Sequence, residues 1–491
     1  MNSQKDIEEY VNKAANVLKD IADAADIKQY IFPMLFFKRI SDIWDEEYEN
    51  AVEIYGTDID VSELNENFRF QIPSGSHWKD IRSISINIGE KIQRALREIE
   101  NKNFQLLNGV FGEAQWTNKN TLSDKKLIDL IEHLSTVKLS LANISHDIMG
   151  RSFEFLVKEF AKETGHTAAD FYTNRTVIDL VLEIVKPEPN ESIYDPACGS
   201  GGFLLKTSSY LKKQGKEHRN IKLYGQELKV FTAAIARINL LMHGIDEFTL
   251  MQGNTIDDPK ILENDELKTF DIIMSNPTFS FDKWNQSKFA SDPFGRNILG
   301  TPPPSIGDYA FEQHIIKSLK KQTGRSVTVM PHGILFRDAE QSMRQKMVEL
   351  DYVDAVIGLG KNLFFGSGME CCLLICRSKK EQIRKGKILF IDAKDEVKLD
   401  RSDAYLLENH ISKISDVFNA FEESIGFSKI VSNEEVLGNK ANLSIQLYVK
   451  QDNLNEDHHI DELLELTRSN QVKLNSNIDK LFNQLKSLGI E

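Results

Sequence analysis

The string Asp-Pro-Ala-Cys-Gly-Ser-Gly-Gly-Phe at residues 195–203 constrains the fold of this chain more than any other segment. It follows a short apolar run and precedes a helical pattern, which predicts a tight turn from a strand into a helix. Glycines at such a turn allow positive φ and let the backbone approach a ligand closely. The spacing is not the G-x-G-x-x-G of dinucleotide folds, and the Lys-Ser/Thr of a phosphate loop is missing. Asp195, four positions before the first glycine, instead favours a positively charged ligand, such as one with an ammonium group.

The region after residue 185 alternates short apolar runs with helical patterns. Strands separated by helices indicate βαβ units and a largely parallel sheet, so we expect an α/β fold. Ligands of such sheets bind at the carboxyl ends of the strands, and the residues that end each run are therefore the candidates for chemistry. The expected strands are Ser192–Asp195, Lys222–Gly225, Thr249–Gln252, Asp271–Ser275, Ser326–Met330, Val353–Gly358 and Cys371–Arg377.

The N-terminal region shows helical patterns and no strand alternation. Ile7, Tyr10 and Val11 begin an apolar face at helical spacing. The next segment, Lys28–Glu49, holds an apolar block that contains Pro33, which predicts either a kink or a late helix start. We therefore expect a helical domain at this end of the chain.

The C-terminal end carries a stripe of leucine and isoleucine with heptad spacing, at Leu474, Ile478, Leu481, Leu485 and Leu488. Two interpretations stay open, namely a terminal helix packed on its own domain and a helix that docks against a partner. The patterns together divide the chain into a helical domain at residues 1–145, an α/β domain at 146–440 and a C-terminal helical segment at 441–491.

Composition excludes several classes of protein. Hydrophobic residues make up 41% and charged residues 27% of the 491 residues, which excludes disordered and collagen-like chains. The longest apolar runs fall far short of the roughly 20 residues that span a bilayer. The polar N-terminus MNSQKDIEEY is not typical of a secretory signal, and the four cysteines form no CxxC pair. We expect a reduced, cytoplasmic protein without disulfides and without a metal centre.

The charge balance restricts how the chain can bind nucleic acid. Its 60 basic and 74 acidic side chains give a formal net charge of −14. Such a chain is not expected to bind nucleic acid strongly through charge alone, so action on DNA would require local basic strips or a more basic partner. The densest charge run, Arg377–Lys387, is expected to be a solvated loop.

Two further strand ends carry side chains that suit a nucleoside. Glu227 ends the second expected strand, where an acid can accept hydrogen bonds from both hydroxyls of a ribose. Asn254 follows the third strand, where its amide can hydrogen-bond to an adenine edge.

The fourth strand runs into Asn276-Pro277-Thr278-Phe279, and this loop indicates the reaction. An exocyclic amino group of a nucleobase is a poor nucleophile, because its lone pair is delocalised into the ring. The Asn276 oxygen and a backbone carbonyl fixed by Pro277 can both accept from that amine and turn its lone pair toward an attacking geometry. Phe279 offers a face on which a base extruded from a duplex can stack.

The motifs DPACGSGG, YGQE, GNT and NPTF, in this order, resemble those of S-adenosylmethionine-dependent N6-adenine DNA methyltransferases. More narrowly, the chain resembles the modification (M) subunit of type I restriction-modification systems. The likeness covers roughly residues 8–380 and includes the N-terminal segment ANVLKDIADAADIKQYIFPMLFFKRISD, and it continues through GDYAFEQHII, VMPHGILFR and VDAVIGLGKNLFFGSGMECCLLI. The resemblance implies a Rossmann-like methyltransferase sheet behind an all-α N-terminal domain.

The resemblance also implies the site residues and the partners. Asn276, Pro277, Thr278 and Phe279 would hold the target adenine. The residues that would bind S-adenosylmethionine are Asp170, Phe171, Tyr172, Thr173, Asn174, Arg175, Asp195, Gly199, Ser200, Gly201, Gly202, Glu227 and Asn254. Two M subunits would act with one specificity (S) subunit that reads the DNA, and a restriction (R) subunit could join them.

The sequence departs from the family pattern at Asn174 and at Thr278, where proline is usual. The proline at the second position typically contributes under about 1 kcal/mol through the unfolded state, so we expect slower transfer and not its loss. The alternative is a cofactor-binding assembly subunit of a DNA-defence complex with weak or no activity. Related loops also serve methylation of protein glutamine and of RNA, but the N-terminal domain and the later motifs favour the DNA family. Transfer to N4 of cytosine is the less favoured alternative, because that group more often begins its loop with Ser or Thr.

Overall fold

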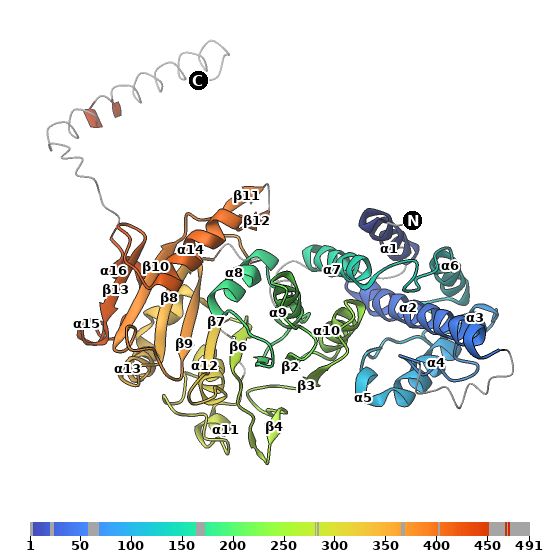
Figure 1. Cartoon of the computed structure of the whole chain (residues 1–491), viewed down its shortest axis with the longest axis horizontal. Coiled ribbons are helices and arrows are strands. Elements are labelled where there is room, and N and C mark those ends of the chain that lie inside the picture. The colour runs from blue at the N-terminus through green and yellow to red at the C-terminus, as the bar shows by residue number, and fades with distance from the viewer. Residues whose placement is uncertain are drawn as a thin grey trace, which may run out of the picture.

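The computed structural model describes residues 3–19, 24–56, 68–163, 172–279, 281, 284–364, 369–400, 403–450, 467–468 and 470–471. The heptad stripe at residues 474–488 therefore lies outside the described residues. Figure 1 shows a helical part at the N-terminal end beside a larger part built around a sheet.

The described residues of the N-terminal part form helices joined by turns and loops, and they contain no strand, as the sequence predicts. Its helices are α1 (Gln4–Val17), α2 (Ala24–Tyr55), α3 (Trp78–Arg82), α4 (Ile88–Lys102), α5 (Phe104–Leu107), α6 (Asp124–Leu134) and α7 (His146–Glu163). The helix α2 begins at Ala24 and continues through Pro33, so the alternative of a late helix start is wrong.

Nine strands among the described residues form one mixed sheet in the order β13-β10-β8-β9-β7-β6-β1-β2-β3. Their bounds are β1 (Ser192–Asp195), β2 (Lys222–Glu227), β3 (Phe248–Gln252), β6 (Ile272–Ser275), β7 (Arg325–Pro331), β8 (Val353–Leu359), β9 (Cys371–Arg377), β10 (Lys387–Ala393) and β13 (Ser428–Ser432). The strands β9 and β13 pair antiparallel with their neighbours, and the other pairings are parallel. All seven predicted strands are present, and the predicted mostly parallel α/β sheet is confirmed.

Two short hairpins stand apart from this sheet, β4 (Leu262–Glu263) with β5 (Glu266–Leu267) and β11 (Lys398–Asp400) with β12 (Asp403–Tyr405). The remaining helices are α8 (Arg175–Val185), α9 (Gly202–Lys213), α10 (Val230–Met242), α11 (Gln286–Ala290), α12 (Asp308–Lys317), α13 (Gln341–Glu349), α14 (Glu408–Ala420), α15 (Asn433–Gly438) and α16 (Ile445–Tyr448), with the 3-10 turns η3 (His332–Leu335) and η4 (Asp338–Glu340).

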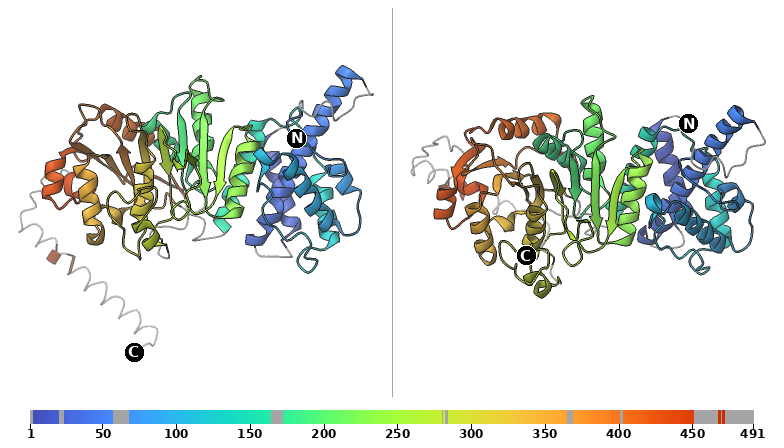
Figure 2. Two further views of the ribbon diagram at one scale, coloured as in Figure 1. Left: turned by 90° about the horizontal axis from the view of Figure 1, so that it is seen from below. Right: turned by 60° about the horizontal axis from the view of Figure 1, so that its bottom comes forward.

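The sheet has apolar side chains on both faces because residues alternate between the faces along each strand. In β9, Cys371, Leu373 and Ile375 join the core under α8, α9 and α14. Cys372 and Leu374 join a second core, under α12, α13, α15 and α16. The sheet is thus the middle of three layers, and Figure 2 shows helices along both of its faces.

The helix α10 joins the two parts of the molecule. Its residues Ile235 and Ile238 belong to the core of the N-terminal helices, whereas Ala233 and Ala236 belong to the core of the sheet. All residues from Thr232 to Met242 are buried. The helix α10 therefore contributes side chains both to the core of the helical part and to the core of the sheet.

The charge run at residues 377–387 is a loop between β9 and β10, but the expectation that it is solvated is wrong at two positions. Lys380 is 8% exposed and pairs with Asp351 at 2.7 Å. Arg384 is 4% exposed and pairs with Asp354 at 3.0 Å. These ion pairs fix the loop against the strand end of β8.

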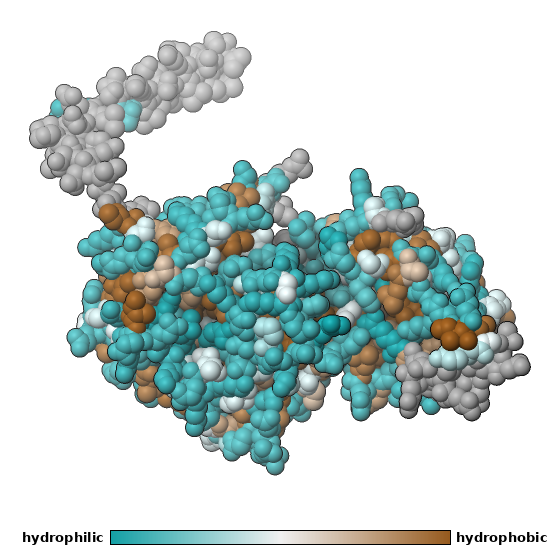
Figure 3. Space-filling view, viewed as in Figure 1, coloured by the Kyte–Doolittle hydropathy of each residue, from teal (hydrophilic) through white to brown (hydrophobic). Residues whose placement is uncertain are grey.

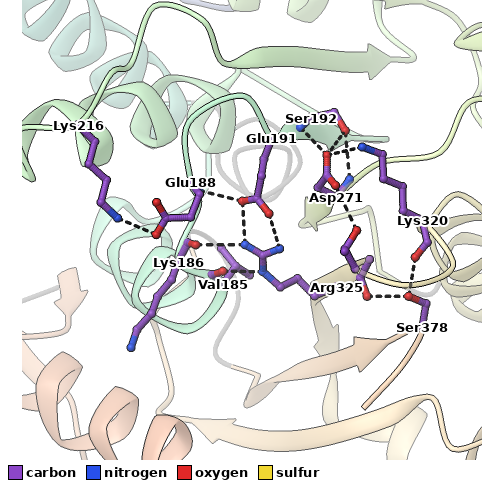
Figure 4. Close-up of polar contacts among 12 residues, drawn as sticks. Val185, Lys186, Glu188, Glu191, Ser192, Lys216, Asp271, Lys320, Arg325 and Ser378 are labelled. Atoms are coloured by element: carbon purple, nitrogen blue, oxygen red, sulfur yellow. Dashed lines mark hydrogen bonds and ion pairs between the residues drawn. The ribbon is translucent and has the colours of Figure 1, made fainter. Parts of the chain in front are cut away.

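A polar network holds together the amino ends of β1, β6 and β7 (Figure 4). Asp271 accepts hydrogen bonds from the backbone N and the hydroxyl of Ser192 at 2.9 and 2.8 Å, and from Lys320 Nζ at 2.7 Å. Arg325 forms a bidentate pair with Glu191 at 2.8 and 2.9 Å. The network lies at the edge of the sheet opposite to the strand ends that carry the candidate site residues.

We expect Asp271→Asn to lower the free energy of unfolding by about 1–3 kcal/mol at neutral pH, because charge-assisted bonds at a buried group are lost. Burial alone raises the pKa of Asp271, but hydrogen bonds from Lys320 and Ser192 outweigh it and lower the pKa from 3.8 to about 2. The stabilisation is thus present above about pH 4 and is lost as the pH falls toward 2. Urea unfolding at several pH values measures this, with the exposed Asp416→Asn as control; equal stability of the two variants would contradict it.

Figure 3 shows that one face of the molecule is mostly hydrophilic, with smaller apolar areas between the polar ones. Among the described helices, none combines the length and the apolar character needed to cross a membrane.

Candidate active site

The glycine-rich turn follows β1 and leads into α9, as predicted. Gly199 and Gly201 have φ of 53° and 79°, which places both in the left-handed region that favours glycine. Gly201 is the N-cap of α9, and Ser200 is buried with its carbonyl accepting from Asn239 Nδ2 at 2.9 Å. The turn therefore presents its backbone at the carboxyl edge of the sheet.

Asp195 ends β1 beside this turn and is 1% exposed. Its Oδ1 accepts hydrogen bonds from the backbone N of Ala197 at 3.1 Å and from Ser275 Oγ at 2.9 Å. Burial raises the pKa of Asp195 to about 7; these two hydrogen bonds oppose the rise and the nearby Glu227 adds to it. A positively charged ligand would favour the ionised carboxylate at this position.

Glu227 ends β2 and faces the same turn. Its Oε2 accepts from the backbone N of Gly199 at 3.0 Å, and its Oε1 accepts from the backbone N of Lys229 at 2.9 Å. Asp195 and Glu227, two of the predicted cofactor residues, thus lie at the same turn, and both are buried.

Arg175 links this turn to the N-terminal part of the molecule. Its guanidinium pairs with Glu154 of α7 at 2.5 Å and lies 4.6 Å from the ring centroid of Tyr172. A Cβ on Gly202 would lie 1.9 Å from Arg175 Nη1. The absence of a side chain at Gly202 therefore lets the Arg175 guanidinium approach the first turn of α9.

The structure gives Asn174 and Thr173 different partners. Asn174 is the N-cap of α8, where its side chain accepts from the backbone N of Thr176, and its Nδ2 donates to the carbonyl of Ala404 at 2.8 Å. Thr173 Oγ1 accepts from Asn276 Nδ2 at 3.2 Å. This last bond joins the predicted cofactor segment to the predicted catalytic loop. Asp170 and Phe171 lie outside the described residues.

The predicted catalytic loop, residues 276–279, leaves the carboxyl end of β6, next to β1 in the sheet. Pro277 is buried, Asn276 and Phe279 are half-buried, and Thr278 is exposed. The Phe279 ring lies edge-on to that of Phe364, with centroids 6.4 Å apart. The side chain of Thr278, where the family usually has proline, is thus exposed to solvent.

Asn254 follows β3, as predicted, and organises its own loop. Its Oδ1 accepts from the backbone N of Ile256 and of Asp257, and its Nδ2 donates to Asp257 Oδ2 at 3.0 Å. The next residue, Thr255, donates through Oγ1 to the carbonyl of Pro196 at 2.5 Å. The loop after β3 is therefore tied to the loop that begins at Asp195.

Sequence reasoning missed Ser275, Glu154 and Phe364, which contact predicted site residues. Ser275 carried a usable signal, because it ends a strand directly before Asn276. Glu154 and Phe364 come from distant elements, and no local pattern marks them.

A glycine turn after the first strand, an acid after the second and an N-P-x-F loop after the fourth share one edge of a mostly parallel sheet. This combination of fold and loops defines a methyltransferase that acts on an amino group.

Comparisons with known proteins agree. The N-6 DNA methylase family model matches residues 144–457, and the HsdM N-terminal domain model matches residues 7–134. The chain is 30% identical to the type I restriction enzyme MjaVII methylase subunit of Methanocaldococcus jannaschii, over 84% of this chain and 72% of that one. It is 26% identical to the MpnII methylase subunit of Mycoplasma pneumoniae, over 95% of each chain.

A solved methyltransferase subunit of the type I restriction-modification system of Streptococcus thermophilus has a TM-score of 0.79 and 25% identity. The match covers 91% of this chain and all of that one. The chain belongs to the N-6 DNA methylase family, as a methyltransferase subunit of the type I restriction-modification kind.

Proposed function

We propose that the chain transfers a methyl group from S-adenosylmethionine to N6 of an adenine flipped out of DNA. The observation that carries the proposal is the hydrogen bond between Asn276 and Thr173. It joins the loop predicted to bind the base to the segment predicted to bind the cofactor, at the edge that holds Asp195 and Glu227. A methyl donor and an amino acceptor held there would meet between the ends of β1 and β6.

The residues present fit S-adenosylmethionine by the chemistry of their side chains. The cofactor carries an ammonium group, a sulfonium centre and a ribose with two hydroxyls. The Asp195 carboxylate, whose pKa of about 7 reflects burial and the nearby Glu227, suits a cationic group. Glu227, which already accepts from the turn backbone, suits the ribose hydroxyls.

When bound, S-adenosylmethionine supplies a methyl group on a positively charged sulfur. The chain then acts by positioning and by hydrogen bonding. Since Asn276 Nδ2 donates to Thr173, the side-chain Oδ1 is the atom that would accept from the adenine amine and orient its lone pair. The Phe279 ring, held edge-on by Phe364, would stack on the extruded base.

We further propose that the chain works in the cytoplasm with a specificity subunit that selects the DNA site, two copies per specificity subunit, and that a restriction subunit joins this assembly. The formal net charge of −14 supports this, because a partner would supply much of the attraction to DNA. Residues 441–491 would contribute to docking on that partner.

Base-modification sequencing of host DNA tests the proposed function. Cells that carry the chain and its specificity subunit should show N6-methyladenine at a two-part motif, and deletion of the gene for this chain should remove the mark. If every mark persisted after the deletion, or if the mark that disappeared were on cytosine, the assignment would be rejected.

The affinity for S-adenosylmethionine should rise with pH up to about 7 and level off above about 8. Asp195 has a pKa of about 7 without ligand, and a bound cation lowers that pKa, so binding below pH 7 releases a proton. Because one proton is released on binding, the affinity should rise by up to about tenfold for each pH unit by which the pH increases toward the pKa of Asp195.

Calorimetric titration at several pH values measures this dependence. The matched variant Asp195→Asn removes the titrating group, so the difference between the parent and the variant excludes titration of the ligand itself. Identical pH profiles of the two proteins would show that Asp195 does not contact the cationic part of the cofactor.

A second candidate function, a cofactor-binding assembly subunit with weak or no activity, is favoured by one observation, the threonine at position 278. We expect Thr278→Pro to change the methylation rate by less than about fivefold, because Thr278 is exposed and a proline constraint is worth under about 1 kcal/mol. Thr278→Ala serves as the control that removes the hydroxyl without adding a ring. An inactive parent beside an active Thr278→Pro variant would favour the second candidate.

A further inference from the structure

Arg296 is a buried cation in the connection between β6 and α12, outside every motif that the sequence singles out. The side chains of Arg296 and Asp292 are both 2% exposed, and Arg296 Nε and Nη2 donate to Asp292 Oδ1 at 3.0 and 2.6 Å. A buried ion pair is weak evidence for stability, since its desolvation offsets much of its attraction. The other contacts of Arg296 therefore indicate what it does.

Two of these contacts hold the loop after β3. Arg296 Nη1 donates to the carbonyl of Thr255 at 2.9 Å, and Nη2 donates to the carbonyl of Ile256 at 2.7 Å. Thr255 in turn donates to the carbonyl of Pro196, the residue after Asp195. A continuous chain of hydrogen bonds thus leads from Arg296 to both loops in which we place the cofactor.

A third contact extends the network to β1. Arg296 Nη1 lies 3.4 Å from His314 Nδ1, and His314 Nε2 lies 3.1 Å from the hydroxyl of Tyr194. A guanidinium can only donate, so Nδ1 accepts and the neutral ring carries its proton on Nε2. Burial, with a further contribution from Arg296, keeps the pKa of His314 well below its usual value. His314 therefore donates to Tyr194, the neighbour of Asp195.

Arg296 lies in the same connection as the predicted base-binding loop. The connection that carries Arg296 begins with Asn276–Phe279 at the end of β6 and ends at α12. It is packed through Phe289 against Ile256 of the loop after β3 and Ala310 of α12. The same connection thus carries the predicted base-binding loop at its start and, further along, donates hydrogen bonds through Arg296 to the loop after β3.

We propose that Arg296 is a positioning residue that sets the loops after β1 and β3 for cofactor binding from the connection that carries the target-base loop. The inference rests on the proposed function, since it concerns the same site. It adds a residue that need not touch the cofactor or the base.

The test is the variant Arg296→Lys in the full chain assembled with its specificity subunit. Lysine keeps the charge beside Asp292 but cannot donate to both carbonyls and to His314. We expect the dissociation constant and the KM for S-adenosylmethionine to rise at least about tenfold, with kcat at saturating cofactor within about threefold of the parent. A purely structural role would lower the active fraction and leave this KM unchanged, and that result would overturn the inference.

The variant Thr255→Val tests the network if Arg296→Lys fails to fold. It removes the hydroxyl that reaches Pro196 and should also raise the KM for the cofactor, whereas Thr207→Val, which removes a buried hydroxyl bonded within α9, should not. If Thr255→Val left the KM of the parent unchanged, the inference would be overturned. Where Arg296→Lys folds, the double variant of Arg296→Lys and Thr255→Val should lose less affinity than the product of the two single losses, because the two residues act in series. Multiplicative losses would overturn the inference. Failure of the parent itself to bind S-adenosylmethionine would reject the proposed function instead.

Discussion

Asn276→Ala should lower the methylation rate about 10²–10³-fold while the protein continues to bind S-adenosylmethionine. In the mechanism that we propose, the Asn276 side chain accepts from the adenine amine, and loss of one preorganised hydrogen-bonding group in an active site typically costs about 10²–10³ in rate. The turn after β1 and Glu227, which we propose to bind the cofactor, are not altered by the substitution. Transfer of labelled methyl groups to DNA by the assembled enzyme measures the first effect, and equilibrium binding of S-adenosylmethionine measures the second.

A matched control is Asn419→Ala, an exposed position on α14 whose amide donates to a carbonyl of α8. It should leave rate and binding within about twofold of the parent, as surface substitutions usually do. If Asn276→Ala retained more than about a tenth of the parent rate, the acceptor role would belong to another group. Loss of cofactor binding in the same variant would mean that the bond to Thr173 is needed to form the cofactor site.

Gly202→Ala should disrupt cofactor binding and destabilise the fold together. The new Cβ would lie 1.9 Å from Arg175 Nη1, so the guanidinium must move away from its partner Glu154. Overpacking costs about 1–3 kcal/mol, and separating a buried ion pair costs about 3–5 kcal/mol if the charge stays buried. We expect a loss of at least about 2 kcal/mol in the free energy of unfolding and a tenfold or larger loss of affinity for S-adenosylmethionine.

Urea unfolding and calorimetric binding measure the two effects. Gly438→Ala is the matched control, because a Cβ there meets no atom within 4 Å and the glycine does not have a positive φ. Its stability should stay within about 1 kcal/mol of the parent. Equal stability of Gly202→Ala and Gly438→Ala would show that Arg175 has room to move and that its pair with Glu154 is not tightly fixed.

The sequence predicted the sheet well because the signals involved are local. Each predicted strand is a run of apolar residues, and the glycine turn and the N-P loop mark the ends of β1 and β6. The last two strands of the sheet along the chain, β10 and the edge strand β13, were not predicted, since β10 follows a charge run directly and β13 is a short segment of mixed polarity. Their place in the sheet is decided by pairing with β8 and with each other.

The positions of Asp195, Glu227 and Asn276 at one edge of the sheet were predictable, because each stands in a local motif at the end of a strand. The candidate site was not predictable where a side chain works through distant partners. Arg175 was assigned to the cofactor, yet its contacts are with Glu154, Tyr172 and Gly202. Such pairings depend on how α7 packs on the sheet domain, and a local pattern carries no information about that packing.

Because α10 contributes to both cores, the helical part and the sheet part are difficult to separate into independent fragments. A fragment that began after the helical part would expose Ile235, Ile238 and Leu241 of α10 to water. A fragment that ended before the sheet would lack α10 and would expose the surface of the N-terminal helices that these residues cover. The family models divide the chain near residue 140, but α10 contributes to both cores, so we expect the two parts to unfold together. Exchange of N-terminal segments between related methylases would therefore succeed only where α10 is exchanged with them.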